Sequence, residues 1–226
     1  MIEIDHICLG ARNFWESTHR LTQETGLGNA EGGWFPEYRL ANRIVPTGGD
    51  TYIEVEGVID AHAVEAGHPV ATFFHEATRE GDCFIGWCAR VDSRAELDAI
   101  ARRLGSDIFE GAMRMRADGS MGHSARTPDT SRAWRAGLPN FFYIEDRSEH
   151  AGRLQPKYGT TTARGIAWME LGGSAEEMSD YLGVDATSLG LRFNGGKPGL
   201  HAMGIRTDNG EAVIRRPVMP GTTGKL

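Results

Sequence analysis

The chain lacks the features that mark secreted, membrane-spanning or disulfide-stabilised proteins. Only three of its 226 residues are cysteines (Cys8, Cys83 and Cys88), and no two of them have the C-x-x-C spacing. This usage favours reduced thiols and a cytoplasmic location. No apolar run approaches the roughly 18 residues that a membrane helix needs. The opening MIEIDHICLG is typical of a strand that contains acidic residues, not of a signal peptide.

Acidic residues outnumber basic ones, 31 to 24. The formal net charge is -7 at pH 7, and no stripe of Lys or Arg stands out. This balance argues against nucleic acid or an anionic membrane as the main partner. The sequence contains no Gly-rich phosphate loop, dinucleotide-binding fingerprint or Ser nucleophile elbow. With 40% apolar and 24% charged residues the chain is an ordinary globular protein, and a small molecule is its expected partner.

What the sequence does contain is a strand–helix opening that recurs about every 80 residues. Each opening has a predicted strand, a capping residue, an acidic residue three positions later, an apolar helical face and a terminating glycine. One such capping signal is weak, but three at nearly constant spacing indicate an internal repeat. The caps are Asn13, Ser93 and Ser174, and the terminating glycines are Gly26, Gly105 and Gly183.

About three strand-like runs follow each helix, so the sequence predicts an α+β fold built from three βαβββ units. In the second unit the expected strands lie around DIFEGAMRMR, SRAWRAG and NFFYIED, with ADGSMGH as a turn. The expected boundaries are residues 1–60 for unit one, 61–82 for a linker with a short helix, 83–146 for unit two, 147–164 for a polar linker, 165–217 for unit three and 218–226 for a tail.

A Tyr-Ile-Glu triplet occurs near the end of a predicted strand in both of the first two units. The copies are Tyr52-Ile53-Glu54 and Tyr143-Ile144-Glu145. Because a strand sends alternate side chains to opposite faces, each Glu shares a face with its Tyr, and each Ile points toward a core. The pattern raises the question of whether the two carboxylates meet at one site.

The paired βαβββ units resemble the vicinal oxygen chelate superfamily, which includes glyoxalase I, extradiol dioxygenases and bleomycin-binding proteins. The first unit is similar to its glyoxalase-like domain branch through IDHICLG, Gly32–Gly33, ANRIVP and YIEVEGV, and the second unit matches in order through RMRADGS and RAWRAGLPNFFYIED. The resemblance covers about residues 2–216. It implies that units one and two form a cupped mixed sheet with helices outside, and it favours a homodimer.

The resemblance also implies one divalent metal in the cup, held by the first and fourth strands of each unit. Carried over by position, these strands offer His6 and Glu54 from unit one and Gly86 and Glu145 from unit two. Glycine is no ligand, so at most three of the four positions are filled. One imidazole and two carboxylates suit Mn, Fe(II), Ni or Zn, and Mg as well, without choosing among them.

Further residues are candidates for substrate contact or proton transfer. Tyr52, Tyr143 and Glu145 are the expected acids or bases. A pocket shaped for an apolar or aromatic substrate would draw its lining and its oxygen contacts from Trp34, Phe35, Asn42, Arg43, Trp87 and Trp134.

The same residues also have plainer interpretations. His6 could be a hydrogen-bonded core histidine, Glu54 could pair with Arg43, and Glu145 could be solvated. His75 or His123 could complete a metal site in place of Glu145.

Two functions of different classes remain open at this point. The first is a metal-dependent lyase or isomerase that stabilises an enolate-like state of a small oxygenated metabolite by Lewis-acid catalysis. An extradiol-type dioxygenase is a weaker variant, since that chemistry normally needs a second histidine where Gly86 stands. The second is a metal-free protein that sequesters a drug-like ligand in the same cup.

Overall fold

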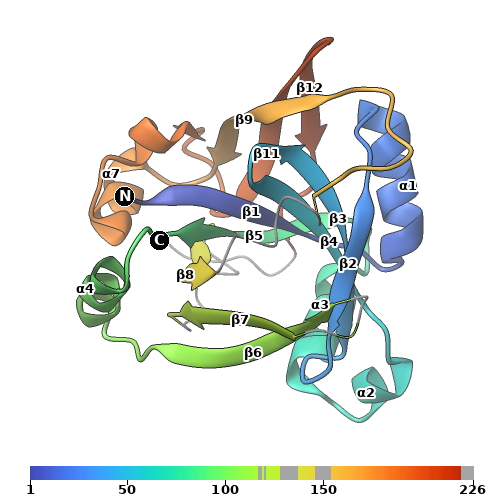
Figure 1. Cartoon of the computed structure of the whole chain (residues 1–226), viewed down its shortest axis with the longest axis horizontal. Coiled ribbons are helices and arrows are strands. Elements are labelled where there is room, and N and C mark those ends of the chain that lie inside the picture. Colours follow the sequence, from blue (N-terminus) through green and yellow to red (C-terminus); the bar gives the residue numbers. More distant parts are fainter. Residues whose placement is uncertain (117–118, 120, 128–136, 146–153, 220–226) are drawn as a thin grey trace.

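The structure is a computed structural model that describes residues 1–116, 119, 121–127, 137–145 and 154–219 (Figure 1). The expected strand around SRAWRAG lies almost wholly outside the described residues. No helix in the described ranges is long and apolar enough to cross a membrane.

The first unit has the predicted βαβββ order. Its helix begins where Asn13 accepts a hydrogen bond from the Glu16 backbone N–H, and it ends at Gly26 in the left-handed conformation, as the capping pattern predicts. The elements are β1 (Glu3–Gly10), α1 (Phe14–Thr25), β2 (Ala30–Phe35), β3 (Leu40–Gly48) and β4 (Thr51–Val58).

The second unit repeats this order and the same capping chemistry, with Ser93 at the start and Gly105 at the end of its helix. One prediction is wrong in detail, because the strand that pairs with β6 includes part of the segment expected to be a turn. The linker forms two short helices. The elements are α2 (Ala61–Glu65), α3 (Pro69–Ala77), β5 (Cys83–Arg90), α4 (Arg94–Leu104), β6 (Phe109–Arg116), β7 (Met121–Arg126) and β8 (Pro139–Glu145).

These eight strands close into one barrel in the order β1-β4-β3-β2-β6-β7-β8-β5. Within each unit the first and fourth strands are parallel neighbours. The units join through the antiparallel pair of β1 and β5 and through a short contact between β2 and β6. The cup predicted from the paired units is therefore confirmed, and α1 and α4 lie outside it (Figure 1).

The third unit has the predicted element order but a different sheet. Its strands are arranged β10-β9-β11-β12, so that its first strand is central rather than at an edge. Ser174 and Gly183 cap its helix as predicted. The elements are β9 (Ala163–Leu171), α7 (Ala175–Leu182), a short 3-10 helix (Ala186–Leu189), β10 (Leu191–Phe193), β11 (Leu200–Thr207) and β12 (Gly210–Arg215).

The main hydrophobic core lies outside the barrel, between its wall and the third unit. Ile7 and Ile53 point outward from β1 and β4, and they belong to one buried cluster with Met169 and Leu171 of β9. The inner face of the barrel is left to other residues. This division follows from strand alternation, which sends His6 and Glu54 inward when Ile7 and Ile53 point outward.

Shortening Leu171 should test whether the third sheet and the barrel share this core. Leu171→Ala removes a fully buried side chain from the shared cluster, and we expect a loss of about 2–5 kcal/mol in unfolding free energy. Urea denaturation measures this loss. Val213→Ala on β12, where the side chain is exposed, is the control and should change stability by less than about 0.5 kcal/mol. Equal effects of the two substitutions would contradict a shared core.

Candidate functional site

The barrel encloses a cavity of about 120 Å³ with a polar and an apolar half. The polar half is lined by His6, Glu54, Glu56, Arg114, Asn140 and Tyr143. The apolar half is lined by Phe35, Leu40, Val70, Phe74, Ile85 and Phe141. Val70 and Phe74 belong to α3, so the linker between the two units contributes one wall. Such a cavity suits a small molecule that is apolar at one end and oxygenated at the other.

The polar half depends on an irregularity in β1. The pairing of β1 with β5 shifts register between Ile4 and His6, and the intervening Asp5 is fully buried beside His6. The His6 Nδ1–H donates to Asp5 Oδ1 at 2.8 Å, and the Tyr143 hydroxyl donates to the same oxygen. Burial alone would raise the pKa of Asp5, but the hydrogen bond and charge of His6 hold it below its ordinary value.

His6 is oriented on both of its nitrogens. With Nδ1 bound to Asp5, its Nε2 faces Glu54 Oε2 at 3.9 Å, and its ring stacks on Tyr52 with centroids 4.9 Å apart. Burial would lower the pKa of His6, but the neighbouring Tyr52, Glu54 and Asp5 outweigh burial and raise it well above the ordinary value. In the absence of another cation, the imidazole is therefore the protonated partner of these carboxylates.

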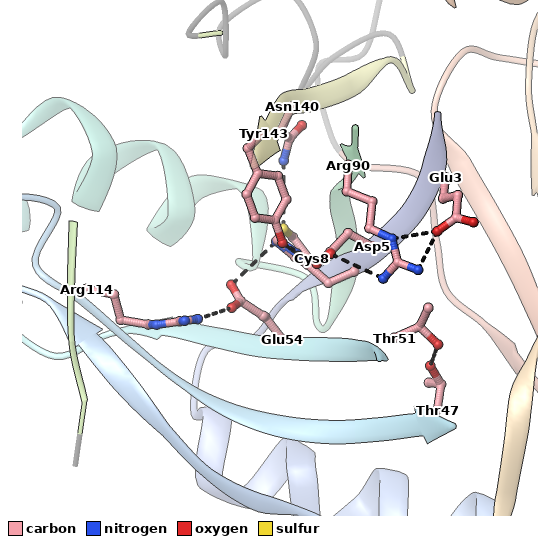
Figure 2. A network of polar contacts seen from close by, with 11 residues as sticks. Glu3, Asp5, Cys8, Thr47, Thr51, Glu54, Arg90, Arg114, Asn140 and Tyr143 are labelled. Atoms are coloured by element: carbon pink, nitrogen blue, oxygen red, sulfur yellow. Dashed lines mark hydrogen bonds and ion pairs between the residues drawn. The ribbon is translucent and has the colours of Figure 1, made fainter. Parts of the chain in front are cut away.

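Glu54 has an arginine partner, although not the one suggested by the sequence. Arg114 of β6 donates to Glu54 Oε1 at 3.3 Å (Figure 2), whereas His6 faces the other carboxylate oxygen, Oε2. Arg43, the partner considered from the sequence, lies on the outer face of the barrel, where it donates to Asn29 and covers the Trp15 ring. Alternation in β3 explains this placement, because Asn42 and Arg43 must face opposite ways.

Glu56 is a cavity residue that the sequence analysis missed. It lies two positions beyond Glu54 on the same face of β4, so the alternation in YIEVEGV could have identified it. Burial, the nearby Cys8 thiol and the hydrogen-bonded Glu54 raise the pKa of Glu56 well above the ordinary 4.5. Glu56 is thus a carboxylic acid that holds its proton beside the carboxylate of Glu54.

The two Tyr-Ile-Glu triplets do not occupy equivalent positions. Cys8 pairs with Glu54 across β1 and β4, whereas the corresponding Cys88 lies opposite the irregular step in β8 that contains Asn140. Tyr143 reaches the site through its hydroxyl. Glu145 pairs with Ser124 at the end of β8, and its side chain lies outside the described part of the structure. The sequence repeat is therefore a poor guide to the register of β8.

Asn140 occupies the place in unit two that Glu54 has in unit one. A Cβ atom at Gly86 would lie 2.3 Å from Asn140 Oδ1, so the side chain of Asn140 needs the glycine. Its amide nitrogen donates to Cys8 Sγ at 3.8 Å. Its buried Oδ1 has no hydrogen-bond partner among the described residues, which leaves an acceptor free toward a ligand.

The remaining predicted residues are dispersed. Phe35 lines the cavity, whereas Trp34 is 49% exposed and does not. The Asn42 side chain accepts a hydrogen bond from the Gly33 backbone N–H. Trp87 lies in the core outside the barrel, where its ring N–H donates a hydrogen bond to the Gly137 carbonyl. Trp134 and the side chain of His123 lie outside the described residues. The structure therefore brings together His6, Tyr52, Glu54, Tyr143 and Phe35 of the predicted set.

The polar half has donors that fit a divalent metal. The His6 Nε2 faces Glu54, and Asp5 holds the other nitrogen, which is the outer-shell arrangement of many metal-bound histidines. Donor atoms of Cys8, Glu54 and Glu56 lie within 4.8 Å of one another. Imidazole with carboxylates suits Mn, Fe, Ni or Zn, and a thiolate would shift the preference toward Zn.

Comparisons with known proteins agree with this fold. A family model for a glyoxalase-like domain matches residues 4–183. A crystal structure of a hypothetical protein from Staphylococcus aureus is similar over 97% of this chain and 88% of its own, with 14% identity and a TM-score of 0.59. The chain therefore belongs to the glyoxalase-like domain family, as the resemblance implied, and the S. aureus structure supports the fold alone. No curated protein matches the sequence.

More distant likenesses cover a little under two thirds of the chain. A methylmalonyl-CoA epimerase from Mycobacterium tuberculosis matches 63% of this chain and 86% of its own, with 10% identity and a TM-score of 0.44. One from Streptomyces coelicolor, in complex with 2-nitronate-propionyl-CoA, matches 64% and 97%, with 11% identity and a TM-score of 0.46. These likenesses are too weak to bear on the function of this chain.

The buried carboxyl of Glu56 should make the metal-free protein less stable as pH rises. Its pKa is raised on folding, so above pH 4.5 the unfolded chain releases a proton that the folded chain keeps, and folding stability falls. Glu56→Gln removes this penalty while Glu54, Cys8 and His6 still surround the position. Urea denaturation between pH 5 and 8, with chelator, should show a steeper decline in the wild type. The exposed Glu31→Gln is the control, and parallel curves for wild type and Glu56→Gln would contradict the interpretation.

Proposed function

We propose that the chain is a metal-dependent enzyme of the isomerase or lyase type that acts on a small oxygenated metabolite inside the barrel. The observation that carries this proposal is the orientation of His6, whose Nε2 faces Glu54 while Asp5 holds Nδ1. A core histidine would need only one of these contacts. In this site Nδ1 is bound to Asp5, while Nε2 faces Glu54 Oε2, an oxygen that can itself bind a metal.

His6 and Glu54 would hold the metal, and Glu145 stays a proposed third ligand. When bound, a divalent metal supplies Lewis-acid polarisation of a substrate oxygen, which favours an enolate-like state. Arg114, already bound to Glu54 at 3.3 Å, lies beside the same oxygens and would stabilise negative charge that develops on the substrate. The apolar walls beyond these residues would limit the water that reaches the reacting carbon.

Proton transfer is assigned to residues that hold a proton at neutral pH or can pass one on. Glu56, with its raised pKa, is a general acid within the cavity. Tyr143 and His6 Nδ1 both donate to Asp5 Oδ1, so a proton that Tyr143 releases would be taken up by that carboxylate. Burial raises the pKa of Tyr52, so Tyr52 stays a neutral ring that stacks on His6. Glu145, from the sequence analysis, stays a further proposed base.

One observation favours the second candidate, a metal-free ligand-binding protein. Arg114 and the protonated His6 together already balance Glu54, so the polar half is electrically satisfied without a metal. The cavity would then retain an amphipathic guest. The extradiol-type variant gains no support, because Gly86 packs on Asn140 and offers no second imidazole. A cytoplasmic homodimer remains our prediction for the assembled protein in either case.

Metal content separates the two candidates. We expect about one divalent metal per chain in protein purified without chelator, lost in His6→Ala and in Glu54→Gln because each removes a ligand. Asp5→Asn removes the carboxylate that orients His6, and it should weaken metal affinity about 10- to 100-fold without abolishing it. Elemental analysis and titration with Mn²⁺ and Zn²⁺ measure these effects. His19→Ala, an exposed histidine of α1, is the matched control and should keep the metal.

Turnover requires a second measurement. A panel of hydroxy ketones and 2-substituted carbonyl compounds, incubated in D₂O and followed by NMR, should show metal-dependent exchange of the proton next to the carbonyl. Exchange that is lost in Glu54→Gln but kept in His19→Ala would support the enzyme. A wild type that binds no metal even after reconstitution with Mn²⁺, Fe²⁺, Ni²⁺ and Zn²⁺ would overturn the proposal and leave the ligand-binding protein.

A further inference from the structure

A second arginine of the cavity, Arg126 of β7, has no role in the site described so far. It is only 8% exposed and lines the cavity. One of its terminal nitrogens, Nη2, donates to the Tyr38 hydroxyl at 2.9 Å. Its guanidinium lies 4.4 Å from the centre of the Phe141 ring and 5.3 Å from that of Phe109. Arg126 is therefore fixed in place by aromatic residues and one phenol.

Arg126 differs from the other arginines of the barrel interior in its charge balance. Arg114 pairs with Glu54, and Arg90 pairs with Glu3 and approaches Asp5 (Figure 2). Among the described residues, no carboxylate lies within ion-pair distance of Arg126, and its buried Nε has no hydrogen-bond partner. The cavity thus contains one guanidinium whose charge no carboxylate in the described part of the chain neutralises.

Such an arrangement is costly unless a ligand completes it. A buried charge needs a partner, and aromatic faces compensate only part of the lost hydration. The planar fork of a guanidinium matches a carboxylate, which accepts two parallel N–H donors. Tyr38 and Phe141 hold that fork at the boundary with the apolar half of the cavity, so little ordering remains to be done when an anion enters.

We propose that Arg126 binds the carboxylate of the substrate, and that the substrate is a small carboxylic acid with an aromatic or branched apolar body. The acid group would lie against Arg126, the body against Phe35, Phe74 and Phe141, and the oxygenated carbon toward His6 and Glu54. The last placement rests on the proposed function, whereas the binding of the carboxylate does not. One guanidinium in a cavity of about 120 Å³ suits a carboxylate better than a phosphate ester, which normally recruits several donors.

Benzoate and benzamide test this proposal, because they have nearly the same shape and differ in charge. Titrations followed by NMR, with chelator present, would be run on the wild type, on Arg126→Met and on Arg126→Lys. We expect the wild type to bind benzoate at least about 10-fold more tightly than benzamide. Arg126→Met should weaken benzoate binding about 10- to 100-fold and leave the affinity for benzamide unchanged. The benzoate affinity of Arg126→Lys should lie between those of the wild type and Arg126→Met.

Arg43→Met is the matched control. Arg43 is as buried as Arg126 and also lies over an aromatic ring, but it is on the outer face of the barrel, so benzoate binding should not change. Equal affinity for the two probes, binding of neither, or full benzoate affinity in Arg126→Met would overturn the proposal. Metal content is measured on the same Arg126→Met protein and should equal that of the wild type. Failure of carboxylate binding is thereby distinguished from failure of the metal site.

Discussion

The candidate site depends on one contact, the hydrogen bond between Asp5 and His6. Neighbouring residues in a regular strand face opposite ways, and only the register shift in β1 brings both side chains to the barrel interior. Asp5 then fixes the imidazole, receives the Tyr143 hydroxyl from the other unit and approaches Arg90 behind it. Without that irregularity, His6 would have no fixed orientation toward Glu54, and the two units would lose the polar link that Tyr143 makes to Asp5.

The two faces of the barrel wall have different roles: the outer face stabilises the fold, and the inner face carries the candidate site. Its outer wall packs against the third sheet in one apolar core, so the inner face is free to hold groups that weaken a fold, such as the neighbouring carboxyls of Glu54 and Glu56. Asn140 Oδ1 and Arg126 Nε, two buried polar atoms without a hydrogen-bond partner in the described ranges, belong to residues that line the same cavity. Unsatisfied groups of this kind are rare in interiors, and their meeting in one cavity is what a binding site for a polar ligand requires.

Much of this architecture was predictable because it is encoded locally. The helix caps at Asn13, Ser93 and Ser174 and the inner face of β4 follow from patterns within a few residues. The rest depends on pairing between distant strands. The counterpart of Glu54 is Asn140 because of an irregularity between β5 and β8, which a repeated triplet cannot reveal. Arg114 reaches Glu54 only because the two units close into a barrel.

The most direct test of the account is the state of the two His6 nitrogens, read by ¹⁵N NMR of histidine-labelled protein. On addition of one equivalent of Zn²⁺, the account predicts that Nε2 of a histidine absent from His6→Ala moves to a metal-bound shift, while Nδ1 keeps the proton that it donates to Asp5. If the His6 resonances do not change, or if Nδ1 is the nitrogen that binds, the proposed arrangement of Asp5, His6 and Glu54 as a metal centre is contradicted.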